Sequence, residues 1–143
     1  MRLLAPAAVM VALWWSSSRT PTPSSPNVVG AFVHNGAHLV AYFTLAAAVW
    51  LARWTGEQRT VPSAARWALW IAIGYGAIDE WHQSAVPGRV ASVSDWMTDG
   101  CGALLAVACL RERLGGRPNR RRALPLLLLA GLGCVALATF GPW

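Results

Sequence analysis

DEWHQSAVPGRVASVSDWMTDGCG, residues 79 to 102, constrains the architecture of this chain more than any other segment. It holds four of the chain's 6 acidic residues, although the sequence around it is apolar enough to cross a membrane. Ionisable side chains inside a bilayer are costly, and they almost always face the interior of a helix bundle or a wet cavity. The stretch therefore predicts a polar site inside a membrane-embedded helical protein.

The composition of the whole chain is that of an integral membrane protein. Apolar residues make up 55% of the 143 positions, only 13% are charged, and all 12 basic residues are arginines. A single domain covering residues 1–143 is expected at this length. The net charge of +6 does not indicate a nucleic-acid partner, because the arginines lie in short runs between apolar stretches and not along one polar face.

Apolar stretches along the chain predict an all-α, polytopic bundle of about five transmembrane helices. A bilayer core of ~30 Å needs about 20 apolar residues in helical conformation. The candidate spans are residues 3–15, which are few for a span, and residues 28–54, 64–86, 93–110 and 123–143. The fourth span begins with Asp95 and Asp99, which only burial in protein or a wet cavity would make tolerable.

The arginines orient this bundle with its amino terminus in the cytoplasm. In that orientation only Arg19 and Arg89 lie outside, as the positive-inside rule favours. Arg2 and the short apolar run after it are also typical of a signal peptide, whose cleavage would leave four spans. No A-x-A-like cleavage site follows, so we favour an uncleaved signal-anchor helix. Residues 16–27 are rich in Pro and Ser and predict an extended external loop.

Polar residues recur on one face of three consecutive predicted spans. Helical spacing groups them as His34, His38 and Tyr42 on the second span, Tyr75, Asp79, His82 and Gln83 with Glu80 beside them on the third, and Asp95 and Asp99 on the fourth. Counting ~1.5 Å per residue from the outer ends of the spans, we expect His38, Asp79 and Asp99 to lie in the outer half of the membrane. We expect three walls of one outward-facing pocket, with Pro87, Gly88 and Arg89 in the turn between two walls. Polar contacts that only hold helices together are the alternative.

The charge of this pocket limits what it can bind. Four carboxylates against Arg89 give a formal charge of −3 with neutral histidines, so we expect at least one acid to be protonated and Arg89 to pair with another. A phosphate would need Arg89, a protonated His38 or a bound divalent cation. His34 and His38 at i, i+4 would also suit zinc with a carboxylate, although the ligand signature is incomplete. The sequence thus permits a divalent cation and indicates no other cofactor.

These residues resemble the VanZ-like family. The resemblance rests on His38 and Tyr42, on Asp79-Glu80 with Gln83, on Pro87-Gly88-Arg89, and on Asp95 and Gly102, and it covers roughly residues 26–110. The family is named for a membrane protein associated with teicoplanin resistance, and its members are multi-span proteins of poorly defined activity. Two positions depart from the family pattern, namely Asp99 where Asn is common and Ala85 where an aromatic residue is more typical.

Three functional hypotheses follow. In the first, the pocket binds an envelope lipid, a wall precursor or a glycopeptide without turnover, and His34, Tyr42, Gln83, Arg89, Asp95 and Asp99 contact the ligand. In the second, an intramembrane enzyme uses Asp79 or Glu80 as general base, His38 as proton partner and Arg89 as anion clamp. In the third, a small proton- or ion-coupled transporter assembles as a homo-oligomer. All three place the protein in the plasma membrane among its lipids.

Overall fold

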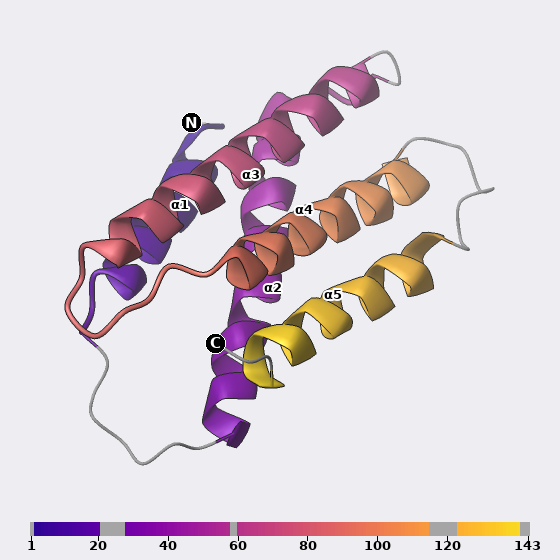
Figure 1. The fold of residues 1–143 in the computed structure, drawn as a ribbon. Coiled ribbons are helices and arrows are strands. Elements are labelled where there is room, and N and C mark those ends of the chain that lie inside the picture. Colours follow the sequence, from indigo (N-terminus) through magenta and orange to yellow (C-terminus); the bar gives the residue numbers. More distant parts are fainter. Residues whose placement is uncertain (1, 21–27, 58–59, 115–122, 141–143) are drawn as a thin grey trace.

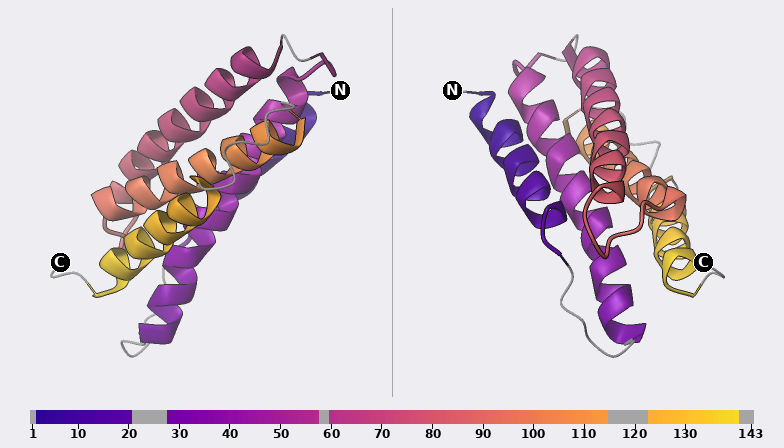
Figure 2. Two further views of the ribbon diagram at one scale, coloured as in Figure 1. Left: turned by 90° about the vertical axis from the view of Figure 1, so that its right-hand side faces the viewer. Right: turned by 60° about the vertical axis from the view of Figure 1, so that its left-hand side comes forward.

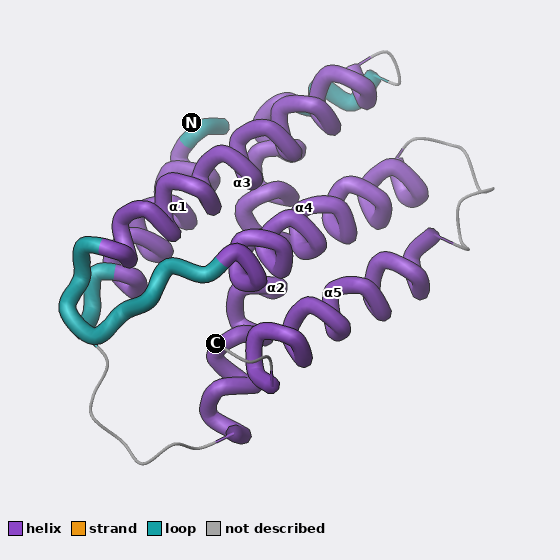
Figure 3. The backbone as a smooth tube through the Cα atoms, in the orientation of Figure 1, coloured by secondary structure: helices purple, strands orange, loops and turns teal. Residues whose placement is uncertain are grey.

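The computed structural model describes residues 2–20, 28–57, 60–114 and 123–140. These residues form helices joined by loops, with no strand among them, so the all-α prediction is confirmed (Figure 3). In chain order the helices are α1 (Leu4–Ser17), α2 (Val28–Arg53), α3 (Val61–Ser84), α4 (Val93–Leu114) and α5 (Ala123–Phe140).

The helix ends differ from the predicted spans in ways that local chemistry explains. Helix α3 begins at Val61 and not at residue 64, because Pro62 lies in its first turn. Backbone N–H groups in the first turn have no partner within the helix, so proline is tolerated there. Helix α4 continues past residue 110 with Arg111 and Arg113 in its last turn. Cations at that position interact favourably with the unpaired carbonyls of a helix carboxyl terminus. Apolarity alone therefore placed the start of α3 too late in the sequence and the end of α4 too early.

Three helices form the centre of the bundle and two lie outside them. Helices α2, α3 and α4 contact one another, α1 packs on α2 and α3, and α5 packs on α4 and α2. Figure 1 and the right-hand view of Figure 2 show α1 and α5 on opposite sides of the central helices. Consecutive central helices run in opposite directions, so the start of α2, the end of α3 and the start of α4 meet at one end.

Two of the described helices are long and apolar enough to cross a membrane, namely α2 and α4. Helix α1 and the segment Leu124–Phe140 are apolar but shorter. Helix α3 has 24 residues, or ~36 Å of helix, yet it carries Arg66, Asp79 and Glu80, which lower its mean hydropathy. Helix length and composition thus support membrane insertion for part of the predicted bundle.

The apolar core occupies the end where α2 finishes and α3 begins. Ala64, Ala68 and Ala72 recur every fourth residue on α3 and are fully buried. They face the large side chains of α2, above all Leu45 and Trp50, which are also fully buried. Small residues on one helix let the backbones approach closely, which is the usual basis of packing between helices in lipid.

Gly102 marks the closest approach of α4 to α2. A Cβ atom at this position would collide with the backbone carbonyl oxygen of Leu39. Only glycine leaves room for this contact, so α4 is held against the middle of α2. This contact places Asp99, one turn before Gly102, beside His38, which precedes Leu39.

Candidate functional site

Polar side chains are buried together at the other end of the central helices. Each of these residues exposes less than a tenth of its surface. They are Asn35 of α2, Asp79, Glu80 and Gln83 of α3, and Ser94, Thr98 and Asp99 of α4. The structure therefore groups polar residues of α2, α3 and α4 at one end of the bundle, as the helical spacing predicted. Burying so many polar groups requires partners for each.

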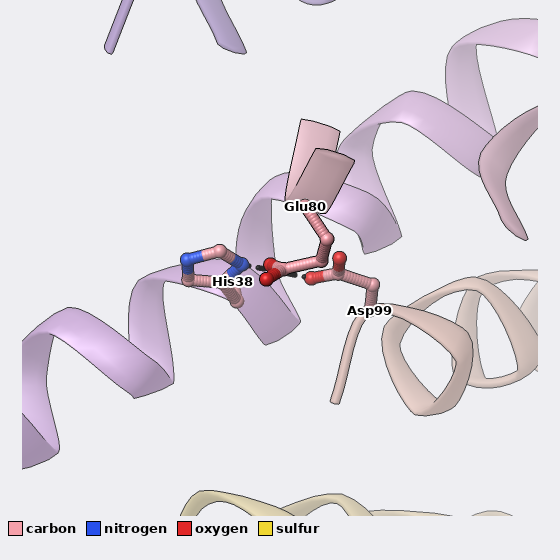
Figure 4. Close-up of side chains that lie close together, drawn as sticks. All are labelled: His38, Glu80 and Asp99. Atoms are coloured by element: carbon pink, nitrogen blue, oxygen red, sulfur yellow. Dashed lines mark hydrogen bonds and ion pairs between the residues drawn. The ribbon is translucent and has the colours of Figure 1, made fainter. Parts of the chain in front are cut away.

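His38, Glu80 and Asp99 form the tightest cluster at this end. The Nδ1 atom of His38 lies 2.9 Å from Oδ1 of Asp99. One ligand atom from each of the three residues lies within 4.8 Å of the other two. Figure 4 shows the three side chains converging from different helices, with the second ring nitrogen of His38 pointing away from the carboxylates.

Several oxygens of this cluster have no hydrogen-bond partner among the described residues. Oε2 of Glu80 accepts a hydrogen bond of 2.6 Å from the backbone N–H of Ser92, whereas Oε1 is unpartnered. Oδ2 of Asp99 and the hydroxyl of Tyr42 are buried and unpartnered as well. Tyr42 stacks on His38 with ring centroids 6.4 Å apart. A buried polar atom without a partner costs on the order of 1–3 kcal/mol, so these atoms do not stabilise the fold.

Asp79 has a different environment from Glu80, its neighbour in sequence. Nε2 of Gln83, one turn later on α3, donates a hydrogen bond of 2.9 Å to Oδ2 of Asp79. The other carboxylate oxygen, Oδ1, is buried and unpartnered in the described structure. Successive residues on a helix point about 100° apart, so Asp79 faces α1 and α2 while Glu80 faces His38 and α4.

A cavity of about 100 Å³ adjoins Asp79 and Gln83. Its remaining walls come from α1, α2 and the loop after α3, through Leu13, Ser16, Ser17, His34, Ala37, His38, Ala41 and Arg89. His38 thus belongs both to the cavity wall and to the carboxylate cluster behind it. A volume of this size accommodates a few water molecules or one small polar group.

The loop between α3 and α4 carries Arg89 to the cavity by a tight turn. The N–H of Arg89 donates to the carbonyl of Val86 over 3.1 Å, and Gly88 has φ of 81°, as the third residue of a type II turn requires. Pro87 suits the second position, where its restricted φ is already correct. The turn predicted from Pro87-Gly88-Arg89 is confirmed.

The expected pairing of Arg89 with a carboxylate is wrong. Its guanidinium donates to the backbone carbonyls of Ser16 and Arg19, over 3.2 and 3.3 Å, and lies 3.2 Å from Nε2 of His34. These carbonyls lie at the carboxyl end of α1, where the unpaired C=O groups attract cations. The backbone of α1 replaces the acid as the partner of Arg89.

His34 and Asp95 lie beside the cluster and not within it. His34 is exposed and its ring centroid is 5.5 Å from that of His38, so the two histidines do not converge on one point. Asp95 is partly buried in the first turn of α4 and interacts electrostatically with His38, His34 and Arg89. The zinc alternative required His34 and His38 to meet at one point. The structure instead brings His38 together with two carboxylates.

Helix α1 supplies the contacts that sequence reasoning missed. The hydroxyl of Tyr75 donates to the carbonyl of Met10 over 2.6 Å. His82 turns out of the expected polar face, stacks on Trp14 with centroids 3.8 Å apart and lies 2.9 Å from Oγ of Ser18. Ser16 and Ser17, expected in an extended loop, are helical and line the cavity. The remainder of that loop, residues 21–27, lies outside the described residues.

The chain matches a known protein family over most of its length. The chain matches the family described as VanZ/LLP1 over residues 3–114. The match extends from α1 through α4, beyond the expected region 26–110, and it leaves α5 outside. No curated protein and no solved structure matches the chain. Because the match covers most of the chain and two of its helices are able to cross a membrane, the chain is a membrane protein of the VanZ/LLP1 family.

Proposed function

We propose that this protein binds a small polar group of an envelope ligand, a lipid-linked wall precursor or a glycopeptide of the teicoplanin type, and thereby contributes to glycopeptide resistance. The observation that carries the proposal is the cavity of about 100 Å³ walled by His38, Asp79, Gln83 and Arg89. These side chains offer both donors and acceptors to one ligand group. Such convergence of a few polar groups is typical of binding sites.

The charge distribution supports a cavity that opens to the extracytoplasmic side of a multi-pass bundle. Arg53 ends α2 and Arg111 and Arg113 end α4, all at the end opposite the cavity. Arg89 lies at the cavity itself. Under the positive-inside rule the arginine-rich end is cytoplasmic, so the cavity faces outward.

The dimensions of the cavity select the part of the ligand that is bound. A volume of about 100 Å³ excludes a whole sugar-peptide unit. A hydroxyl, hydroxymethyl or amide group would reach Asp79 and Gln83, while the rest of the ligand lies outside the bundle. A neutral group needs no compensation of the excess negative charge at this end, which disfavours a bare phosphate.

Resistance and binding measurements together test this proposal. We expect Asp79→Asn and Arg89→Ala to lower teicoplanin resistance to the level of cells without the protein, with unchanged membrane insertion. The same variants, purified in nanodiscs, should bind lipid-linked wall precursor or teicoplanin at least tenfold more weakly than the wild type. Glu57→Gln, an exposed carboxylate at the opposite end, is the matched control. Wild-type resistance and binding in both cavity variants would refute the proposal.

A second function, intramembrane acid/base catalysis, is favoured by one observation. His38 and Asp99 are paired at 2.9 Å, with Glu80 close to both, which is an arrangement suited to moving a proton. Mass spectrometry of lipids and wall precursors incubated with the purified protein separates the two functions. New products that disappear in Glu80→Gln would establish catalysis, whereas co-purified ligand of unchanged mass would support binding.

A further inference from the structure

We propose that His38, Glu80 and Asp99 bind one divalent transition-metal cation, with Zn²⁺ and Mn²⁺ as the candidates. The imidazole Nδ1 and one oxygen from each carboxylate would be the protein ligands. The three residues come from α2, α3 and α4, so the ion would join the three central helices at their polar end (Figure 4). The inference concerns a site next to the proposed ligand cavity and does not require that cavity to bind anything.

The distances suit an ion after a small adjustment. Ligand atoms about 2.1 Å from a metal lie about 3.0 Å apart in neighbouring octahedral positions and about 3.4 Å apart in a tetrahedron. The Nδ1 of His38 and Oδ1 of Asp99 are 2.9 Å apart, and the whole set lies within 4.8 Å. Glu80 has to approach by rotation about its terminal torsion, which is a broad and inexpensive movement.

Charge balance supplies the strongest physical reason for an ion. Glu80 is 7% exposed and Asp99 is fully buried, and no arginine among the described residues pairs with either carboxylate. Two adjacent carboxylates in a bundle surrounded by lipid repel each other and lack solvent. A divalent cation with one neutral imidazole and two carboxylates forms a site of zero net charge. The ion thus removes the electrostatic cost of burying both acids.

The unpartnered atoms and their surroundings point to the same place. Oε1 of Glu80 and Oδ2 of Asp99 are buried acceptors without donors in the described structure, and a metal or its bound water would satisfy them. The N–H of Ser92 holds Glu80 from outside the cluster, and Tyr42 stacks on the His38 ring. Outer contacts of this kind hold metal ligands in position.

Room beside the cluster is provided by Gly76 of α3. A Cβ atom at this position would lie 3.0 Å from Oδ2 of Asp99. A residue with a side chain would press on the carboxylate and restrict the movement that metal binding needs. The absence of a side chain at Gly76 leaves the second oxygen of Asp99 free to turn toward an ion.

The donor set selects the class of metal. One imidazole nitrogen with two carboxylate oxygens suits Zn²⁺ and Mn²⁺, whereas an all-oxygen set would favour Mg²⁺ or Ca²⁺. Three protein ligands leave at least one position for water. The sulfur atoms of Cys101 and Cys134 lie 3.9 Å apart between α4 and α5, and a pair of thiols takes up added zinc without forming a complete site. Any metal measurement has to exclude this pair.

Metal content and affinity test the proposal directly. The full-length chain with Cys101→Ser and Cys134→Ser, free of any histidine tag, would be purified in detergent, loaded with Zn²⁺ or Mn²⁺ and desalted. We expect about one equivalent of metal by mass spectrometry. Asp99→Asn and Glu80→Gln should each weaken binding at least tenfold in calorimetry, because each removes an anionic ligand. Asp79→Asn, a buried acid outside the cluster, should retain the metal.

Cobalt spectroscopy gives an answer that needs no substitution in the proposed site. Co²⁺ added to the chain with Cys101→Ser and Cys134→Ser should give the weak visible bands of a nitrogen and oxygen site, without the intense near-ultraviolet band of thiolate ligands. Metal content below 0.1 equivalent in the wild type, or full metal content in both Asp99→Asn and Glu80→Gln, would overturn the proposal. Arg89→Ala should lose ligand binding and keep the metal, so failure of this site and failure of the proposed function are distinguishable.

Discussion

The two ends of the central helices contrast sharply, although the same three helices form both. At one end Trp50 and Leu45 of α2 pack on a row of buried alanines of α3. At the other end Asp79, Glu80 and Asp99 are buried to the same degree, yet each keeps an unpartnered oxygen in the described structure. Close packing holds the first end together. The first end leaves the neutral indole N–H of Trp50 unpartnered, whereas the second end leaves oxygens of three carboxylates unpartnered, a higher cost that is typical of functional sites.

The largest change in stability is expected from the apolar end. Trp50→Ala should lower the free energy of unfolding by about 2–3 kcal/mol, measured by denaturation in mixed micelles. This expected loss is no larger than the usual cost of replacing a buried aromatic residue by alanine in a soluble protein. Lipid is as apolar as the protein interior, so the substitution mainly removes packing contacts. Trp70→Ala, at a side chain that is 74% exposed, is the matched control and should change stability by less than about 0.5 kcal/mol. Equal effects of the two variants would mean that this end is not the stabilising one.

An intermediate change is expected where the two ends meet. Gly102→Ala should cost about 1–3 kcal/mol, because the new methyl group collides with the Leu39 carbonyl and separates α4 from α2. The same substitution at Gly100, on the same helix, meets no atom within 4 Å. Gly100→Ala should therefore be neutral or slightly stabilising in the same denaturation assay. A neutral Gly102→Ala would show that the helices do not approach as closely as described.

The smallest change in stability is expected at the polar end. In metal-free protein, Glu80→Gln should alter the free energy of unfolding by less than about 1 kcal/mol in either direction. The amide retains an acceptor for the N–H of Ser92 and removes a buried negative charge, so the gain and the loss nearly cancel. A loss as large as that of Trp50→Ala would mean that the carboxylate stabilises the fold, which would remove the contrast between the two ends.

Much of the fold was predictable because apolar length is a one-dimensional signal. The second span was predicted to begin at Val28 and the fourth at Val93, and the structure begins α2 and α4 there. The ends of α3 and α4 were less predictable, since Pro62 and Arg111 extend helices by capping chemistry and not by apolarity. The contribution of α1 to the cavity was missed, because its short apolar run carries no polar pattern that points to a site and is also typical of a signal peptide.

The candidate site was predictable as a set of residues but not as a set of contacts. Helical spacing placed His38, Asp79 and Gln83 at one end of the bundle, where the structure has them. It could not separate the neighbours Asp79 and Glu80, which contact different partners. It also assigned Arg89 to an acid, because backbone carbonyls leave no signature in side-chain composition.

The sequence by itself determined that this protein is helical, where α2 and α4 begin, that polar groups gather at one end of three helices, and which family it resembles. These properties follow from apolar length, helical period and charge placement along one chain. Only the tertiary structure decided that His38 meets Asp99 and Glu80, that Asp79 lines a cavity, and that Arg89 binds the end of α1. A helical period defines which residues share a face, but the neighbour of that face is set by how closely helices approach, as Gly102 permits for α4 and α2.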